Sequence, residues 1–194
     1  RVNINEEGIW EYANICKDLG IGMICMDEGW DHDTRDEMGD WVPKREKFPN
    51  MKELISRIQK KLGMLVELFV APFYVGPLSE AFKKLKEARI LTEVGESGYL
   101  CPRNPLTKEF VSEVGARVVK DLGPDAILID VTQGIPMQRC VANHEHSYES
   151  MGEGYNECTK AMCTSMMEAK SDIIIETCDT TNLNSKLFFR VNYD

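Results

Sequence analysis

Residues 105–131 read PLTKEFVSEVGARVVKDLGPDAILIDV, and this stretch joins a helix pattern to a strand pattern. Its first part repeats apolar residues at the spacing of one helix face, at Val111, Val114, Val118 and Leu122. Pro105 suits the first turn of that helix, where its missing amide hydrogen is not needed. The short apolar run that follows is typical of a parallel strand covered on both faces. The stretch predicts a helix followed by a strand that ends at Asp130.

The same alternation of an amphipathic helix and a short apolar strand recurs along the chain. We expect further helices over residues 6–19, 51–62, 78–90 and 155–169. We expect further strands over residues 22–27, 64–72, 98–101, 172–178 and 186–194. Helices and strands that alternate this regularly predict βα units around a parallel sheet, which is either closed into a barrel or open and doubly wound.

Acidic residues at the ends of the predicted strands decide between these two folds. They are Asp27 with Glu28, Asp130, Glu176 and Asp194. A barrel gathers the carboxyl ends of its strands on one face, where catalytic residues converge. A doubly wound nucleotide-binding sheet would usually carry a glycine-rich loop after its first strand, and the segment DEGWDH is not such a loop. We therefore predict a (β/α)8 TIM-type barrel.

The predicted barrel is incomplete. The chain has 194 residues, whereas about 250 residues are typical of the closed fold. The pattern provides about six βα units of the eight that a barrel needs, so we expect the C-terminal units to be missing. We expect a single domain over residues 1–194, which needs its missing barrel segment or a homo-oligomer partner.

Composition excludes several classes of protein. The net charge of −9 disfavours nucleic acid or an anionic membrane as a partner, because both attract basic patches. No signal peptide or membrane-spanning run is recognised. The seven cysteines form no CxxC pair and predict reduced, buried thiols, with no disulfide framework and no zinc site. We expect no cofactor, no metal and a reducing, cytoplasmic compartment.

Several carboxylates at the ends of neighbouring strands suit glycoside chemistry. Retaining hydrolysis needs one carboxylate as a nucleophile and another as the acid/base, about 5 Å apart across the anomeric carbon. Further carboxylates and an aromatic face would hold the hydroxyls and the apolar side of a sugar ring. Strand-end acids can also serve a purely structural role, so this pattern alone leaves both interpretations open.

Longer stretches carry a resemblance to a known family. Residues 26–72 contain an acidic pair before Gly-Trp, then Gly-Asp-Trp, Phe-Pro, a helix, Gly-Met and a strand that ends in Pro. In this order they resemble the core of the α-galactosidase-type glycoside hydrolases, families 36 and 27. Residues 99–130 resemble the later segment that leads to the nucleophile of that family, and RVNYD at residues 190–194 resembles its Arg-Asn-Phe-Ala-Asp.

The resemblance implies a retaining α-glycosidase that cleaves terminal α-linked sugars. Asp130 would be the nucleophile and Asp194 the acid/base, with Glu176 as a second candidate for the acid/base. Asp27 and Glu28 would accept hydrogen bonds from the 4- and 6-hydroxyls of the sugar. The remaining substrate-binding residues that it implies are Trp30 and Trp41 as pocket walls, Asp40, Glu176 near the 2-hydroxyl, Cys178, and Arg190 beside the glycosyl group.

The loop at residues 140–154 resembles a Cys-x-x-x-His-x-His loop in other barrels of the same clan. The resemblance implies that His144 and His146 line the substrate pocket. An alternative is that these histidines hold a metal with the strand-end acids in a metal-dependent hydrolase, since histidine is a common ligand.

Two departures from the family bear on the substrate. Leu128 stands where the family has a lysine that contacts sugar hydroxyls, and CDTTNLNSK at residues 178–186 replaces a Cys-x-Ser-Gly-Gly-x-Arg loop. A pocket that loses such a cation should accept a different sugar, because buried hydroxyls must find partners. The partner expected from the resemblance is a carbohydrate substrate of open identity. A carbohydrate-binding barrel without catalysis is the alternative.

Overall fold

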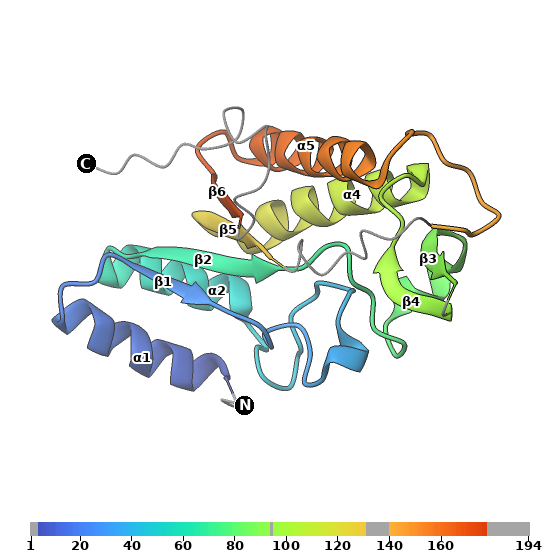
Figure 1. Ribbon diagram of the computed structural model, residues 1–194. Coiled ribbons are helices and arrows are strands. Elements are labelled where there is room, and N and C mark those ends of the chain that lie inside the picture. The colour runs from blue at the N-terminus through green and yellow to red at the C-terminus, as the bar shows by residue number, and fades with distance from the viewer. Residues whose placement is uncertain (1–3, 94, 131–139, 178–194) are drawn as a thin grey trace.

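The computed structural model describes residues 4–93, 95–130 and 140–177, and a parallel sheet forms its centre. The strands run in the order β1-β2-β5-β6, and every neighbouring pair is parallel. Their bounds are β1 (Met23–Met26), β2 (Leu65–Val70), β5 (Ala126–Ile129) and β6 (Ile174–Thr177). The sheet is flanked by α1 (Glu6–Asp18), α2 (Met51–Arg57), α4 (Pro105–Leu122) and α5 (Met151–Ala169). Figure 1 shows α1 beside β1, and α4 and α5 side by side.

The helix predicted over residues 105–122 is confirmed. Asn104 caps its first turn by accepting a hydrogen bond from the amide of Leu106, and Gly123 ends it with a φ of 71°. The helix predicted over 155–169 begins earlier, at Met151, because the hydroxyl of Ser150 caps it by accepting from the amide of Glu153. The helix predicted over 51–62 is α2, continued by one π-helical turn, η2 (Ile58–Leu62).

A second, smaller sheet lies beyond the carboxyl ends of β1 and β2 (Figure 1). It is an antiparallel hairpin of β3 (Arg89–Thr92) and β4 (Gly95–Leu100). It is preceded by α3 (Glu80–Lys84) and a single 3-10 turn, η3 (Lys86–Ala88). Another 3-10 turn, η1 (Arg35–Glu37), lies in the loop after β1. The long helix predicted over 78–90 is therefore wrong beyond Lys84, since its last residues enter β3.

The strand predicted over 98–101 also needs correction. Residues 95–100 do form a strand, but it pairs with β3 and does not join the parallel sheet. Its sequence, GESGYL, is largely polar and lacks the continuous apolar run of a strand covered on both faces. The described residues therefore contribute four parallel strands to a barrel, fewer than the about six that the pattern predicted. The strand predicted over 186–194 lies outside the described residues.

The parallel sheet has two unlike faces. The outer face is apolar and merges with helix residues into one core, with strand positions at Ile24, Met26, Val66, Leu68, Ile127, Ile129 and Ile175. Side chains alternate along a strand, so the next residues point to the opposite, inner face. The register aligns Cys25 with Glu67, and Phe69 with Leu128 and Glu176, across that inner face. In a barrel, the inner face surrounds the central axis.

One carboxylate joins three elements at the amino end of the sheet. Asp125, just before β5, accepts hydrogen bonds from the Val66 amide at 3.0 Å and from Gln59 Nε2 at 2.9 Å. Its other oxygen lies 3.1 Å from Lys170 Nζ, after α5. These contacts hold β2, η2 and α5 together, far along the strands from their carboxyl ends.

Among the described helices, none combines the length and apolar character needed to cross a membrane.

We expect Gly154→Ala to destabilise the fold. A Cβ at Gly154 would lie 2.5 Å from the carbonyl oxygen of Pro102, a backbone atom that cannot swing away. Forcing an extra methyl into such a contact costs about 1–3 kcal/mol of the free energy of unfolding. For a protein of this size the melting temperature should fall by about 2–4 °C for each kcal/mol, as measured by thermal circular dichroism.

Gly152→Ala is the matched control on the same helix. A Cβ there meets nothing within 4 Å, so alanine should leave the stability unchanged or raise it slightly through helix propensity. Equal melting temperatures for the two variants would contradict the close contact of α5 with Pro102.

Candidate functional site

Three of the predicted acids stand directly after strands of the parallel sheet, on either side of β2. Asp27 and Glu28 follow β1, and Asp130 follows β5. The amide of Asp130 donates to the carbonyl of Val70 at 2.9 Å, so the pairing of β2 and β5 extends to Asp130 and fixes its backbone. Asp27 and Glu28 are exposed and Asp130 is half-buried. The structure thus places these three predicted residues at the carboxyl edge of one sheet.

Glu176 lies one residue before the end of β6 and is exposed. Glu176 is in register with Leu128, so both side chains point to the same face of the sheet. Asp130 stands two residues after Leu128, and the alternation of side chains along a strand directs it to that face as well. Leu128 is half-buried on the inner face, beside Phe69 and Glu176 in the register. The position at which the family resemblance expects a lysine is therefore directed to the same face as the acids.

Glu67 is a functional candidate that the sequence analysis missed. It lies on β2 with 5% of its surface exposed. Burial raises the pKa of its carboxyl group, a hydrogen bond with Cys25 opposes this, and the charges of Glu176 and Asp27 raise the pKa further. The register of β2, β5 and β6 places Glu67 and Glu176 on the same inner face. A glutamate inside the apolar run LVELFV was the available signal, because a buried acid needs a reason to be there.

Cys25 faces Glu67 across the register of β1 and β2. Loss of hydration on the inner face, and then the carboxylate of Glu67, raise the pKa of the Cys25 thiol well above its usual value. A thiol with a raised pKa stays protonated and is a poor nucleophile. Cys25 therefore packs beside the acids without being a candidate nucleophile.

Trp30 and Trp41 are buried in the described part of the chain, and their role as walls of a sugar pocket stays a prediction. Their side chains are 0% and 1% exposed. The indole of Trp30 donates to the carbonyl of Phe69 at 2.9 Å, and the rings of Trp30 and Trp41 are 5.9 Å apart. Trp41 also lies 6.0 Å from the ring of Phe69. The tryptophans thus form an aromatic core that supports the carboxyl end of β2.

Asp40 makes structural contacts, and the substrate-binding role expected for it stays a prediction. Its two carboxylate oxygens accept hydrogen bonds from the amides of Glu80 and Ala81 at 2.9 and 2.8 Å. Its backbone carbonyl accepts from Arg117 at 2.7 Å. Each carboxylate oxygen accepts a hydrogen bond from the first turn of α3, so Asp40 fixes the loop to that helix.

The carboxylate of Asp31 is buried against His32. Asp31 Oδ1 lies 2.5 Å from His32 Nδ1, and His32 Nε2 lies 3.4 Å from Glu28 Oε1. Burial lowers the pKa of His32, but its contacts with Asp31 and Glu28 outweigh burial and raise it. The imidazole therefore links a buried acid to Glu28 and restrains that carboxylate. Sequence reasoning missed His32, although its spacing four residues after Glu28 was visible.

The other acids of this segment differ in exposure, since Asp33 is exposed and Glu37 is half-buried. Asp33 and Glu37 nevertheless form ion pairs, both with Lys44 and, for Asp33, also with Lys47 at 2.6 Å. These contacts lower the pKa of Asp33 to about 2. Asp36 is exposed as well.

A cavity of about 870 Å³ adjoins the carboxyl end of β1. Asp27, Glu28 and His32 line it together with residues of α1, and Arg35 and Lys47 add positive charge. This volume lies within the range of small-molecule sites in proteins. The cavity therefore lies beside the acidic pair, while neither Asp130 nor Glu176 is among the residues that line it.

The remaining predicted site residues lie elsewhere. His144 and His146 lie with Cys101 and Cys140, in a cluster that contains none of the strand-end acids. Neither histidine lines the cavity beside Asp27. Cys178, Arg190 and Asp194 lie outside the described residues.

Comparisons with known proteins identify the family of the chain. The melibiase family model matches residues 2–179. The curated α-galactosidase AgaA of Geobacillus stearothermophilus is 35% identical over 85 residues, which cover 42% of this chain and 12% of AgaA. The α-galactosidase of Escherichia coli is 31% identical over 84 residues, which cover 42% of this chain and 12% of that protein. The matched region is thus a small share of each relative.

Solved structures give the same fold. The crystal structure of AgaA from Geobacillus stearothermophilus superimposes with a TM-score of 0.73 at 19% identity, over 90% of this chain and 26% of that chain. The α-galactosidase of Lactobacillus brevis gives 0.72 at 18% identity, over 90% and 25%. The described sheet and helices therefore form part of a TIM-type barrel. Because the family model covers nearly the whole chain, the protein belongs to the melibiase family, the α-galactosidase family of glycoside hydrolase families 36 and 27.

Proposed function

We propose that this chain is the part of a retaining α-glycosidase barrel that binds the terminal sugar and supplies the nucleophile, Asp130. The observation that carries the proposal is the convergence of Asp27, Asp130 and Glu176 at the carboxyl end of one parallel sheet. Membership of the melibiase family and the names of its α-galactosidase relatives support the reaction class.

The proposed reaction has two steps. Asp130 attacks the anomeric carbon while Asp194 gives its proton to the leaving oxygen, and a glycosyl ester forms on Asp130. Asp194, now a carboxylate, takes a proton from water, and the water oxygen attacks the same carbon. The ester bond breaks, the sugar leaves with retained configuration, and both carboxyl groups return to their first state. Asp194 is assigned from the resemblance, and Glu176 is the other candidate for this role.

Sugar binding is proposed for the acidic pair after β1. Asp27 and Glu28 line the cavity and can accept hydrogen bonds from two hydroxyls. His32 holds Glu28 through one ring nitrogen and is itself held by the buried Asp31 through the other. A carboxylate restrained before the sugar arrives loses less conformational entropy on binding. The contacts from Asp31 through His32 to Glu28 thus increase the affinity for the sugar.

The sugar is set in part by Leu128. Its side chain shares the inner face with Asp130 and Glu176, where the family pattern has a lysine. An aliphatic group there cannot donate a hydrogen bond to a hydroxyl. We propose an α-linked sugar that presents an apolar or hydrogen-bond-free group at this position, so galactose is disfavoured.

We expect Asp130→Asn to lower kcat for aryl α-glycosides by about 10³-fold or more, because the amide is not a nucleophile. Initial rates on a panel of aryl α-glycosides provide the measurement. Asp121→Asn, an exposed acid on α4, is the control and should keep the rate of the unaltered protein. Unchanged hydrolysis by Asp130→Asn would remove this residue from the mechanism.

The variant Asp130→Gly separates a nucleophile from a structural acid. Azide is small enough to enter the space left by the carboxylate and should attack the anomeric carbon from the same side. We expect azide to restore turnover and to yield a β-glycosyl azide, identified by NMR. Sugar binding without cleavage in the unaltered protein would instead establish a carbohydrate-binding barrel.

We expect Leu128→Lys to raise kcat/KM for an aryl α-galactoside by about tenfold or more. The added ammonium group can donate to a sugar hydroxyl, and a hydrogen bond to a charged group contributes about 1.5–3 kcal/mol. Leu128→Met, which is similar in size and uncharged, is the control and should not show this gain. A galactoside preference in the unaltered protein, or an equal gain in both variants, would contradict the role of Leu128.

A further inference from the structure

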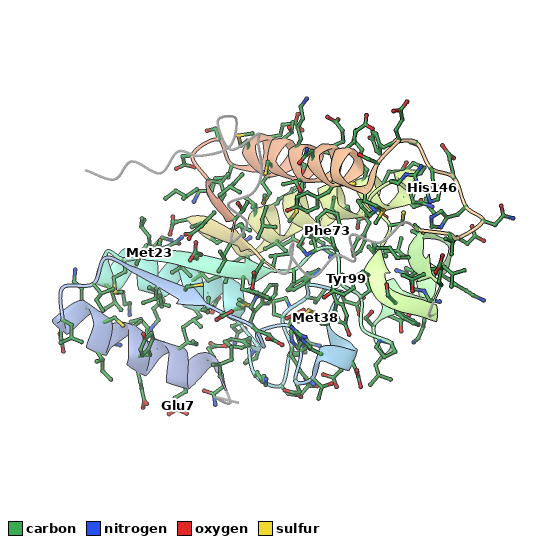
Figure 2. The ribbon with its side chains drawn as sticks, in the orientation of Figure 1. Glu7, Met23, Met38, Phe73, Tyr99 and His146 are labelled. Carbon is green, nitrogen blue, oxygen red and sulfur yellow. The ribbon has the colours of Figure 1, made fainter. Side chains whose placement is uncertain are left out.

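A second group of reactive side chains lies away from the strand-end acids. Cys101 follows β4 directly, and Cys140, His144 and His146 come from the segment between residue 140 and α5. One ligand atom from each residue lies within 4.8 Å of the others. Both cysteines are buried and both histidines are half-buried. Figure 2 places His146 at the end of the molecule beside the hairpin.

We propose that these four side chains bind one structural zinc ion. The ligands are Sγ of Cys101 and Cys140, Nε2 of His144 and one ring nitrogen of His146. The proposal does not depend on glycosidase activity, because it concerns another part of the chain.

The separations suit tetrahedral zinc. Zinc–sulfur and zinc–nitrogen bonds of about 2.3 and 2.0 Å at a tetrahedral angle place the two ligand atoms about 3.5 Å apart. Cys140 Sγ and His144 Nε2 are 3.5 Å apart. The rings of His144 and His146 meet edge to face with centroids 4.6 Å apart, which allows both to point to one centre. The four side chains thus need little movement to close around an ion.

The second nitrogen of His144 is also placed as in a metal site. His144 Nδ1 lies 2.6 Å from the carbonyl oxygen of Glu87, so the proton belongs on Nδ1 and Nε2 keeps its lone pair for a metal. Histidine ligands in metal sites almost always donate their other nitrogen in this way. Glu87 lies in η3, so this contact also ties the loop to the base of the hairpin.

Backbone hydrogen bonds hold the ligands from both sides. Three of them join the ligand segments to the hairpin and the start of α4: Cys101 N to Ala88 O at 2.7 Å, Val141 N to Leu91 O at 2.8 Å, and Ser147 N to Arg103 O at 2.8 Å. Residues 140–150 have no helix or strand of their own. A metal that joins Cys101 to this segment would hold a long loop against the hairpin, as structural zinc does in small protein units.

The donor set selects zinc over other divalent ions. Magnesium and calcium prefer oxygen ligands, whereas two thiolates and two imidazoles suit zinc. Four protein ligands fill the tetrahedral shell, so no position remains for a reacting water, as a catalytic site requires. The site is therefore structural. The absence of CxxC pairs predicted no zinc site. Cys101 lies 39 positions before Cys140, and only the fold brings the two thiols together.

The test uses the full chain, purified with a reductant and without chelators. Inductively coupled plasma mass spectrometry should find about one zinc ion per chain, and X-ray absorption at the zinc edge should show two sulfur and two nitrogen neighbours. Cys140→Ala and His146→Ala should each lower the zinc content by about tenfold or more under the same chelator challenge. Cys163→Ala is the control, because Cys163 is a buried thiol on α5 outside the cluster.

Three results would overturn the proposal. One is a chain that contains no zinc and takes none up when zinc is added to the reduced protein. Another is a zinc shell without sulfur, which also decides the matter if the alanine variants fail to fold. The third is a disulfide between Cys101 and Cys140 in protein kept under reductant, detected by mass spectrometry. Loss of hydrolysis in other variants affects none of these measurements, so the two proposals fail independently.

Discussion

The in-register pairing of four parallel strands is the constraint on which the rest of the structure depends. It places Cys25 beside Glu67, and Phe69 beside Leu128 and Glu176, on the inner face. It also brings the residues that follow β1 and β5 to the same edge. A shift of one residue in any strand would turn its acids into the apolar layer beneath the helices. Burial of the apolar outer face therefore fixes the register of the strands, and the register fixes where the strand-end acids lie.

The segment after β1 shows how a polar loop is fixed over an apolar sheet. Its tryptophans, Trp30 and Trp41, lie in the core and contact Phe69 of β2. The carboxylate of Asp40 accepts hydrogen bonds from the first turn of α3. Asp31 and His32 are buried as a pair, and Asp33 forms ion pairs with two lysines. Asp27 and Glu28 line the same cavity as Asp33 and, among the described residues, form no ion pair with a lysine there. Most of the charge in this segment thus serves to shape the loop, and the acidic pair is the part that faces a ligand.

Local patterns predicted the helices α1, α2 and α4, the four parallel strands and the strand-end positions of Asp27 and Asp130. They failed where tertiary contacts decide the outcome. Residues 98–101 have strand character but pair with β3 outside the parallel sheet. The burial of Trp30 and the contacts of Asp40 with α3 likewise could not be read from the sequence motifs. The grouping of Cys101 with His144 depends on contacts between distant segments, which no local pattern contains. His32 and Glu67 were missed although each had a local signal: His32 stands four residues after Glu28, and Glu67 interrupts an apolar strand.

Several carboxylates share the inner face, and trapping the glycosyl ester identifies which of them is the nucleophile. A 5-fluoro-α-glycosyl fluoride slows the second step of retaining hydrolysis and allows the glycosyl ester to accumulate. Peptide mass spectrometry after brief treatment would locate that ester. The account predicts a single adduct on Asp130, in the peptide that contains β5. An adduct on Glu67 or Glu176 in place of Asp130 would contradict it.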